Sequence, residues 1–385
     1  MFPKCRHLAL FSVLLLSYAN PTFSFSPTPI VACSSPIEVH RAISFYIKPN
    51  DCVLELGAQL SDTSSHLCRT VGSGGDVILV DIKRNERTSG RSSNRDVSRF
   101  VARDILLQPT AASGESFLDR VQYKELEQFD QWRAVAQEKT YHAMILDVGT
   151  MIGNDLYLTA LSLANEFIAN QAIPPRVIII KSKTLSTLAR RIVHSQRLLA
   201  GSTTVSNDLE RTHEPTIVPC VGVNEYRRTI PYLVRPGDDV IEVGCHFGQT
   251  TTLLYDTVRM TKEGGIITRD GFCVGVDIGP KIIANAKRQH PQIPFEVVDA
   301  WKTLDLLKIK VNHDRTDTLG YDVVYADIGG LSGAHGLLES LALLDAIAKA
   351  LEPRCIVIKS LCVNRLASQL LSFSNVWIKL NAKRL

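Results

Sequence analysis

Five charged side chains in the second half of the sequence stand at the ends of short apolar runs: Glu242, Asp277, Asp299, Asp327 and Lys359. Each run is rich in apolar residues, as is typical of strands buried on both faces of a parallel sheet. Ligands of open α/β sheets bind outside the carboxyl ends of the strands. Carboxylates there can accept hydrogen bonds from ligand hydroxyls, and a carboxylate or a lysine can take up a proton. The pattern therefore predicts a ligand site at one edge of a sheet.

The site is organised around the stretch 238–252, DDVIEVGCHFGQTTT. A strand over Val240–Val243 is expected to lead into a glycine turn and then into the first turn of a helix. Gly244 allows a sharp turn with positive φ, and Gly248 allows helix, strand and ligand to approach closely. Any nucleotide-binding strand-to-helix turn can have this form, so the strands that follow decide the interpretation.

Four polar side chains of this loop each have two interpretations. Cys245 is either a reactive thiol or a small residue in a tight turn. His246 either contacts a ligand carboxylate or fills the loop. Gln249 and Thr250 either donate to a ligand carboxylate or start the helix.

The apolar runs downstream alternate with segments of helical pattern. Further strands are expected within GFCVGVDIG (271–279), PFEVVDAW (294–301), YDVVYADIGG (321–330) and RCIVIKS (354–360), and helices over 250–260, 280–290 and 336–351. This alternation predicts an α/β fold with a doubly wound, Rossmann-like parallel sheet.

These residues resemble the class I S-adenosylmethionine-dependent methyltransferases, over Leu233 to about Ser360. The spacing Glu242-x-Gly244-x-x-x-Gly248 is similar to the family's first motif, with His246 in place of its middle glycine. The resemblance implies that Asp277 holds the ribose hydroxyls, that Asp299 and Ala300 lie beside the adenine, and that Asp327 lies near the transferred methyl. The implied contacts of S-adenosyl-L-methionine are Glu242, Gly244, Cys245, His246, Gly248, Gln249, Thr250, Asp277, Ile278, Asp299, Ala300 and Asp327. Trp301 either stacks on the adenine or caps the core.

Asp327 and Lys359 are the predicted catalytic residues. They end adjacent strands, so their side chains are expected at the same rim, where Lys359 could act as a base. YADIGG and IVIKS resemble fibrillarin and the FtsJ-type ribose 2′-O-methyltransferases, which implies RNA ribose as the methyl acceptor. Those enzymes have a lysine before the first motif, where this chain has Arg227 and Arg228. The alternative is a structural ion pair between Lys359 and Asp327.

The same pattern also runs through the first half of the chain. CVLELG (52–57), DVILVDI (76–82), RFVARDI (99–105), HAMILDVG (142–149) and PPRVIIIKS (174–182) parallel the five strands above, so that Glu55, Asp81, Asp104, Asp147 and Lys181 match Glu242, Asp277, Asp299, Asp327 and Lys359. A repeat of this length indicates tandem duplication of a whole domain. We expect a first domain over 36–200, a linker over 201–221 and a second domain over 222–385.

The first copy lacks the second glycine, because Ser61 stands in the place of Gly248. A side chain there would crowd a cofactor or push the helix away. We therefore expect a degenerate first domain and a cofactor site in the second. Little room remains after NVWIKL for the family's last strands, so the two halves are expected to pack together and cover the sheet edge.

The N-terminal residues 1–26 have the features of a signal or transit peptide. Lys4 and Arg6 precede the apolar run Leu8–Leu16, and small residues follow. This leader predicts a plastid or secretory address. No other segment is expected to be apolar enough to cross a membrane. The nine cysteines form no Cys-x-x-Cys pair and are predicted to be buried thiols without a metal.

Two other function classes remain open. A scaffold that has kept the fold without catalysis would show the same strands. A nicotinamide-dependent oxidoreductase would use the same sheet, but the G-x-x-x-G spacing differs from its G-x-G-x-x-G fingerprint.

Overall fold

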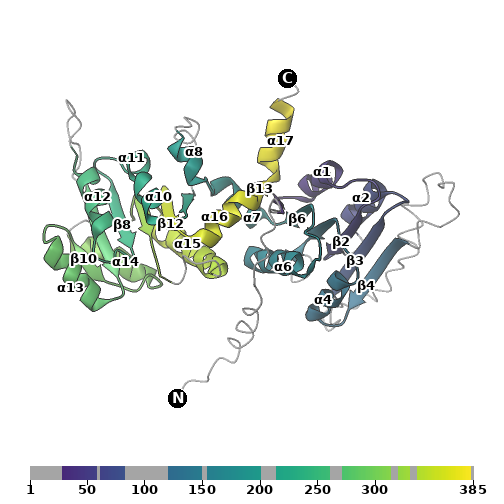
Figure 1. Ribbon diagram of the computed structural model, residues 1–385, viewed down its shortest axis with the longest axis horizontal. Helices are drawn as coiled ribbons and strands as arrows, with labels where there is room; N and C mark the ends of the chain where they lie inside the picture. The colour runs from purple at the N-terminus through teal and green to yellow at the C-terminus, as the bar shows by residue number, and fades with distance from the viewer. Residues whose placement is uncertain are drawn as a thin grey trace, which may run out of the picture.

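The structure, a computed structural model, describes residues 28–58, 61–82, 120–149, 154–200, 214–260, 271–313, 320–329 and 336–382. Two parallel sheets, each flanked by helices, make up the described part of the chain (Figure 1). This α/β arrangement is Rossmann-like and confirms the predicted fold class. The predicted leader, residues 1–26, lies outside the described residues, and its plastid or secretory address stays a prediction.

The second sheet carries the predicted site. Its strands, in spatial order, are β10 (Phe295–Val297), β9 (Phe272–Asp277), β8 (Asp239–Val243), β11 (Val323–Ala326), β12 (Cys355–Lys359) and β7 (Thr216–Cys220). The five strands predicted in this half are all present. Strand β7 was not predicted, and it lies inside the span expected to be a linker. It pairs in parallel with β12, so part of that span belongs to the sheet.

The first sheet has the same strand order with one addition. Its strands are β13 (Leu370–Ser372), β1 (Ile30–Cys33), β6 (Val177–Lys181), β5 (Ala143–Leu146), β2 (Cys52–Leu56), β3 (Asp76–Ile82) and β4 (Val121–Leu126). The run 99–105 lies outside the described residues. Beside β3, where the second sheet has β10 beside β9, lies β4. The register places Glu125 opposite Asp81, as Val297 lies opposite Asp277, so the position of Asp299 corresponds to Glu127 rather than to the predicted Asp104.

Helices cover the sheets. They are α1 (Pro36–Tyr46), α2 (Asp62–Val71), α4 (Trp132–Gln137, after the 3-10 turn η4, Phe129–Gln131), α6 (Tyr157–Asn170), α7 (Lys183–Arg191), α8 (Ser195–Leu199), α10 (Val223–Arg228), α11 (Ile230–Leu233), α12 (Gln249–Val258), α13 (Pro280–Gln289), α14 (Thr303–Asn312), α15 (Leu337–Leu351), α16 (Leu361–Gln369) and α17 (Phe373–Ala382). Serine caps begin three of them: Ser35, Ser182 and Ser360 accept hydrogen bonds from backbone N–H groups of the first turn. No described helix has both the length and the apolar character that crossing a membrane would require.

The second half of the chain contributes a strand to the first sheet, and the first half contributes an isolated bridge to the second sheet. After α16, strand β13 pairs in parallel with β1, beginning at Leu370 opposite Ile30. After α7, Ile192 forms a parallel bridge with Ile217 of β7. Figure 1 shows the result, with β13 and α17 next to the first sheet although they are the C-terminal end of the chain. Phe373 of α17 is accordingly buried in the core of the first half. The halves are therefore joined through the edges of both sheets.

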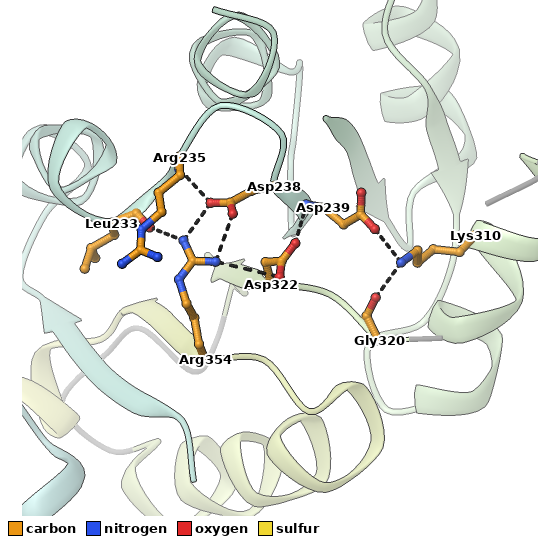
Figure 2. Close-up of polar contacts among 8 residues, drawn as sticks. All are labelled: Leu233, Arg235, Asp238, Asp239, Lys310, Gly320, Asp322 and Arg354. Atoms are coloured by element: carbon orange, nitrogen blue, oxygen red, sulfur yellow. Dashed lines mark hydrogen bonds and ion pairs between the residues drawn. The ribbon is translucent and has the colours of Figure 1, made fainter. Parts of the chain in front are cut away.

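An arginine joins the amino-terminal ends of the strands in each half. Arg354 donates two hydrogen bonds to the carboxylate of Asp238, of 3.0 and 2.6 Å, and one to the carbonyl of Leu233 (Figure 2). In the first half, Arg176 donates to both carboxylate oxygens of Asp51 and to the carbonyl of Tyr46. A bidentate arginine fixes two elements in one relative orientation. These networks lie at the ends of the strands opposite the predicted site.

In the second half, a buried ion pair between Lys310 and Asp239 also connects α14 to the start of β8. The Lys310 Nζ lies 2.6 Å from a carboxylate oxygen of Asp239, and both side chains are 1% exposed (Figure 2). The ammonium also donates to the carbonyl of Gly320 at 2.6 Å. Because an uncompensated buried charge is costly, removal of the lysine alone would leave the aspartate strongly destabilised.

Candidate functional site

The turn after β8 is held close to the end of β11. Gly244 has φ +82°, and a Cβ there would overlap the backbone carbonyl of Asp327. The N–H groups of Gly244 and Cys245 both donate to the carbonyl of Val276 in β9, at 2.8 and 3.0 Å. Glycine at 244 is therefore needed for backbone conformation and for close approach, as the sequence predicted.

Gly248 also has positive φ, +82°, but the group that excludes a side chain there is unexpected. A Cβ at this position would lie 2.6 Å from the ring of Phe295 in β10 and 3.2 Å from His290. The need for glycine thus arises from packing within the protein. His246, between the two glycines, has φ +49°, a conformation that is uncommon for a non-glycine residue.

Asp277 closes the loop from the neighbouring strand. One carboxylate oxygen accepts a hydrogen bond from the N–H of Gly279 at 2.9 Å, and the other accepts one from the N–H of His246 at 3.3 Å. The side chain is only half-buried, and Ile278 beside it is 69% exposed. Asp277 can therefore accept further hydrogen bonds from a ligand at the rim.

The segment after β10 turns on Asp299, whose carboxylate accepts a hydrogen bond from the N–H of Trp301 at 3.1 Å. Ala300 packs against the core, whereas Trp301 is 50% exposed. The indole therefore does not act as a core cap and presents an apolar face next to the site.

Glu242 lies beneath the turn and is nearly inaccessible to solvent, with 2% of its surface exposed. Its Oε2 accepts a hydrogen bond from the Thr251 hydroxyl at 2.5 Å. Burial raises the pKa of Glu242 to about 8, and the charge of Asp327 adds to the increase, while the hydrogen bond from Thr251 and the charge of Arg227 oppose it. Its position suits a role beneath the loop rather than direct contact with a large ligand.

The Cys245 thiol belongs to a small apolar cluster. The side chain is 4% exposed and packs with residues that include Ile283 and Phe295. Burial, reinforced by the nearby charge of Glu242, raises the pKa of this thiol, so the nucleophilic thiolate is disfavoured. Of the two interpretations, the geometry favours a small residue in a tight turn.

Arg227, on the helix before β8, contacts the start of α12. Its Nε donates to the Thr250 hydroxyl at 3.0 Å, and a terminal nitrogen donates to the Gln249 side-chain oxygen at 3.2 Å. The N-cap residue of α12 is Gly248, without a side-chain cap bond, so Gln249 and Thr250 serve the arginine rather than the helix. Arg228 points to solvent as an exposed residue.

Tyr226 was not identified from the sequence. It is fully buried, its ring packs edge-to-face on Tyr325 at 5.0 Å, and its hydroxyl has no hydrogen-bond partner within the described residues. Desolvation by burial raises its pKa, and the nearby charges of Glu242 and Asp327 contribute. Nothing in the local sequence distinguishes this tyrosine from a core aromatic residue.

The predicted catalytic pair is in contact. Lys359 Nζ lies 2.5 and 2.6 Å from the two carboxylate oxygens of Asp327, and both side chains are about one quarter exposed. In the first half, Lys181 donates to Asp147 at 2.6 Å with similar exposure. A lysine and a carboxylate at a strand rim can exchange a proton with a ligand, but the repeated pair equally suits an architectural role. No group of three or more potential metal ligands occurs in the described part of the chain.

Comparison with known proteins finds only remote similarity. Neither the protein-family models nor the curated proteins contain a match to the chain. Among solved structures, a cyclopropane-fatty-acyl-phospholipid synthase-like protein from Lactobacillus casei is 15% identical over 40% of this chain and 54% of its own, with a TM-score of 0.26. A sugar N-methyltransferase from Streptoalloteichus is 18% identical over 41% of this chain and 52% of its own, with a TM-score of 0.24. The chain thus matches about half the length of each of these two proteins.

A third structure covers more of the chain. It is a phosphoethanolamine N-methyltransferase from Haemonchus contortus in complex with S-adenosylhomocysteine, 9% identical over 76% of this chain and 67% of its own, with a TM-score of 0.21. Scores this low carry no argument for a shared activity. The function is therefore argued from the site itself.

Proposed function

We propose that this protein is an S-adenosylmethionine-dependent methyltransferase with its cofactor site at the carboxyl edge of the second sheet. The observation that carries the proposal is the position of Glu242, Asp277, Asp299, Asp327 and Lys359 at or just after the carboxyl ends of parallel strands of one sheet, where β8 leads into a glycine turn with positive φ. Ligands of doubly wound sheets bind at this edge.

The residues present fit such a cofactor. Asp277 has capacity to accept hydrogen bonds from the two ribose hydroxyls, because it is half-buried and already oriented by Gly279. The exposed side chains of Ile278 and Trp301 offer apolar surface for an adenine ring. Arg227 holds the beginning of α12 beside the loop, and its guanidinium would suit the carboxylate of the cofactor's methionine part.

In the proposed reaction the cofactor supplies an electrophilic methyl group. The chain's own residues must orient the acceptor and remove its proton. We assign RNA ribose 2′-hydroxyl as the acceptor, Lys359 as the base, and Asp327 as the group that orients the lysine. The support for this assignment is the contact of Lys359 with Asp327 at the rim and the resemblance of the two strand ends to ribose methyltransferases.

We further propose that the chain arose by duplication of one domain. The six strands that occur in the same order in both sheets and the paired arginine networks support it. A non-catalytic scaffold remains the second candidate, because the Lys181–Asp147 pair in the first half has the same geometry as Lys359–Asp327.

The two candidates are separated by a transfer assay with labelled S-adenosylmethionine and RNA. Lys359→Ala is expected to keep cofactor affinity and lose transfer by about 100-fold or more, the size typical of a general base. Lys181→Ala is the matched control, since it removes the same ion pair from the other half and is expected to leave transfer unchanged. Equal losses in both variants, or full activity in Lys359→Ala, would contradict the base assignment. Binding without any transfer to RNA would favour the scaffold or another acceptor.

A further inference from the structure

We propose that the first half of the chain holds a second ligand site, for a ribonucleoside ligand of the same class as the cofactor, at the carboxyl edge of the first sheet. The inference rests on the proposed function of the second half and extends it to a position expected to be degenerate. Its residues are Glu55, Gly57 and Asp81, with Ser64 supporting Glu55.

The turn after β2 has the same backbone construction as the cofactor turn. Gly57 has φ +80°, and the N–H groups of Gly57 and Ala58 donate to the carbonyl of Val80, at 2.9 and 3.3 Å. In the second half the corresponding donors bond the carbonyl of Val276. A left-handed turn that brings two N–H groups onto the neighbouring strand is therefore retained in both halves.

A side-chain contact between the helix before the strand and the first turn of the helix after it is also present in both halves: α1 contacts α2, and α10 contacts α12. His40 of α1 contacts the Thr63 hydroxyl at 3.2 Å, where the second half has Arg227 on Thr250. The helix and the loop thus keep their relative placement although the side chains differ.

Ser61, which stands in the place of Gly248, has a different backbone conformation from that glycine. The second half needs glycine because Phe295, which lies opposite Gly275, reaches Gly248. In the first sheet the register places Tyr123 opposite Leu79, so an aromatic ring is present at the corresponding position, but the residue that it faces is leucine instead of glycine. Ser61 has φ −92°, an ordinary extended conformation, and serves as the N-cap residue of α2. Because its φ is negative, position 61 does not require glycine, so the loss of glycine there is not by itself a reason to expect a degenerate domain.

The glutamate beneath the turn of this half differs from its counterpart in its hydrogen bonding. Glu55 is 3% exposed, and its Oε2 has no hydrogen-bond partner within the described residues. Its counterpart, Glu242, has that capacity met by Thr251. Buried polar atoms normally have partners, so an unmet oxygen beneath a ligand turn calls for one.

Asp81 sets the class of ligand. It ends β3 next to the turn, as Asp277 ends β9, and a carboxylate at the end of this strand is the group that accepts ribose hydroxyls in doubly wound sheets. The shared geometry favours a ribonucleoside, with S-adenosylhomocysteine as the probe.

Native mass spectrometry of the full chain with S-adenosylhomocysteine counts the sites directly. Two ligands per chain are expected, falling to one in Asp81→Asn and in Asp277→Asn, and to none in the double variant, which also controls for non-specific adducts. Each Asn is expected to weaken its own site about tenfold or more, as for loss of a charged hydrogen bond.

The outcomes separate this inference from the proposed function. One ligand in the unmodified chain, lost in Asp277→Asn and unaffected by Asp81→Asn, would overturn the second site and leave the proposed function intact. One ligand with the opposite dependence would support the first-half site and overturn the placement of the cofactor. No ligand at all would overturn both. Two ligands in the unmodified chain would support the second site even if a variant fails to fold.

Discussion

Replacement of Glu242 by Gln is expected to remove a large part of the pH dependence of stability. Glu242 has a pKa of about 8 in the folded protein, because burial disfavours its charged form, against an ordinary value of 4.5. Between these values the unfolded chain has lost a proton that the folded chain keeps, so stability falls as pH rises. The contribution is fully present below the unfolded value and is lost as pH rises through about 8.

The magnitude follows from linkage. A carboxyl with these two pKa values lowers the free energy of unfolding by about 3 kcal/mol between roughly pH 5.5 and 8.5. Glutamine cannot ionise but keeps an oxygen for the Thr251 hydroxyl, so Glu242→Gln is expected to remove this fall. Glu55→Gln should do the same, because the pKa of Glu55 is also raised to about 8 by burial.

Urea unfolding at the two pH values, followed by circular dichroism, measures the effect. The control is Thr251→Val, which removes the hydrogen bond but keeps the titrating carboxyl and should retain the fall. The reasoning is refuted if Glu242→Gln and the unmodified protein lose the same free energy between the two pH values.

Five further substitutions test the packing and the loop. Lys310→Met should lower the free energy of unfolding by about 3–5 kcal/mol, because it leaves a buried carboxylate unpaired. Lys308→Met, at an exposed ion pair, should lower it by less than about 0.5 kcal/mol. Urea unfolding midpoints measure both changes. Phe373→Ala should lower the free energy of unfolding by about 3–5 kcal/mol, because its ring lies in the core of the first half although the residue is near the C-terminus. Ile378→Ala, at an exposed position of the same helix, should be near neutral. An equally small loss in Phe373→Ala would contradict the packing of this C-terminal segment on the first sheet. Gly244→Ala should cost about 1–3 kcal/mol and weaken cofactor binding, because positive φ and a backbone overlap both oppose a Cβ; unchanged binding would show that the turn tolerates movement.

The central strands and their carboxyl ends were predictable from the sequence. Fully buried parallel strands need continuous apolar runs, and the runs before Asp277, Asp327 and Lys359 end within one residue of the observed strands. Alternation of these runs with helical segments is enough to predict the sheet edge at which the polar side chains gather.

The outer strands were not predictable in the same way. Strand β7 contains Pro219 and follows a segment rich in polar residues, so its composition indicated a linker. Strand β4 mixes charged and apolar residues because it is less buried, and β13 has only three residues. Pairing of β13 with β1 joins positions at opposite ends of the chain, and local pattern carries no information on such contacts.

In the site, too, local features were predictable from the sequence and tertiary contacts were not. Gly244 and Asp277 are recognisable because their roles are local, in a turn and at a strand end. Arg227 and Tyr226 reach the site only through tertiary packing of α10, and Phe295 determines the need for glycine at 248 from another strand. Residue type and spacing could not reveal these contacts.

The central claim is that the carboxyl edge of the second sheet binds the adenosyl cofactor. Calorimetric titration of the protein with S-adenosylhomocysteine, compared with Asp277→Ala, tests it most directly. The account predicts binding in the unmodified protein and loss of that site in the variant, with circular dichroism unchanged. Absence of binding, or binding that Asp277→Ala leaves intact, would contradict it.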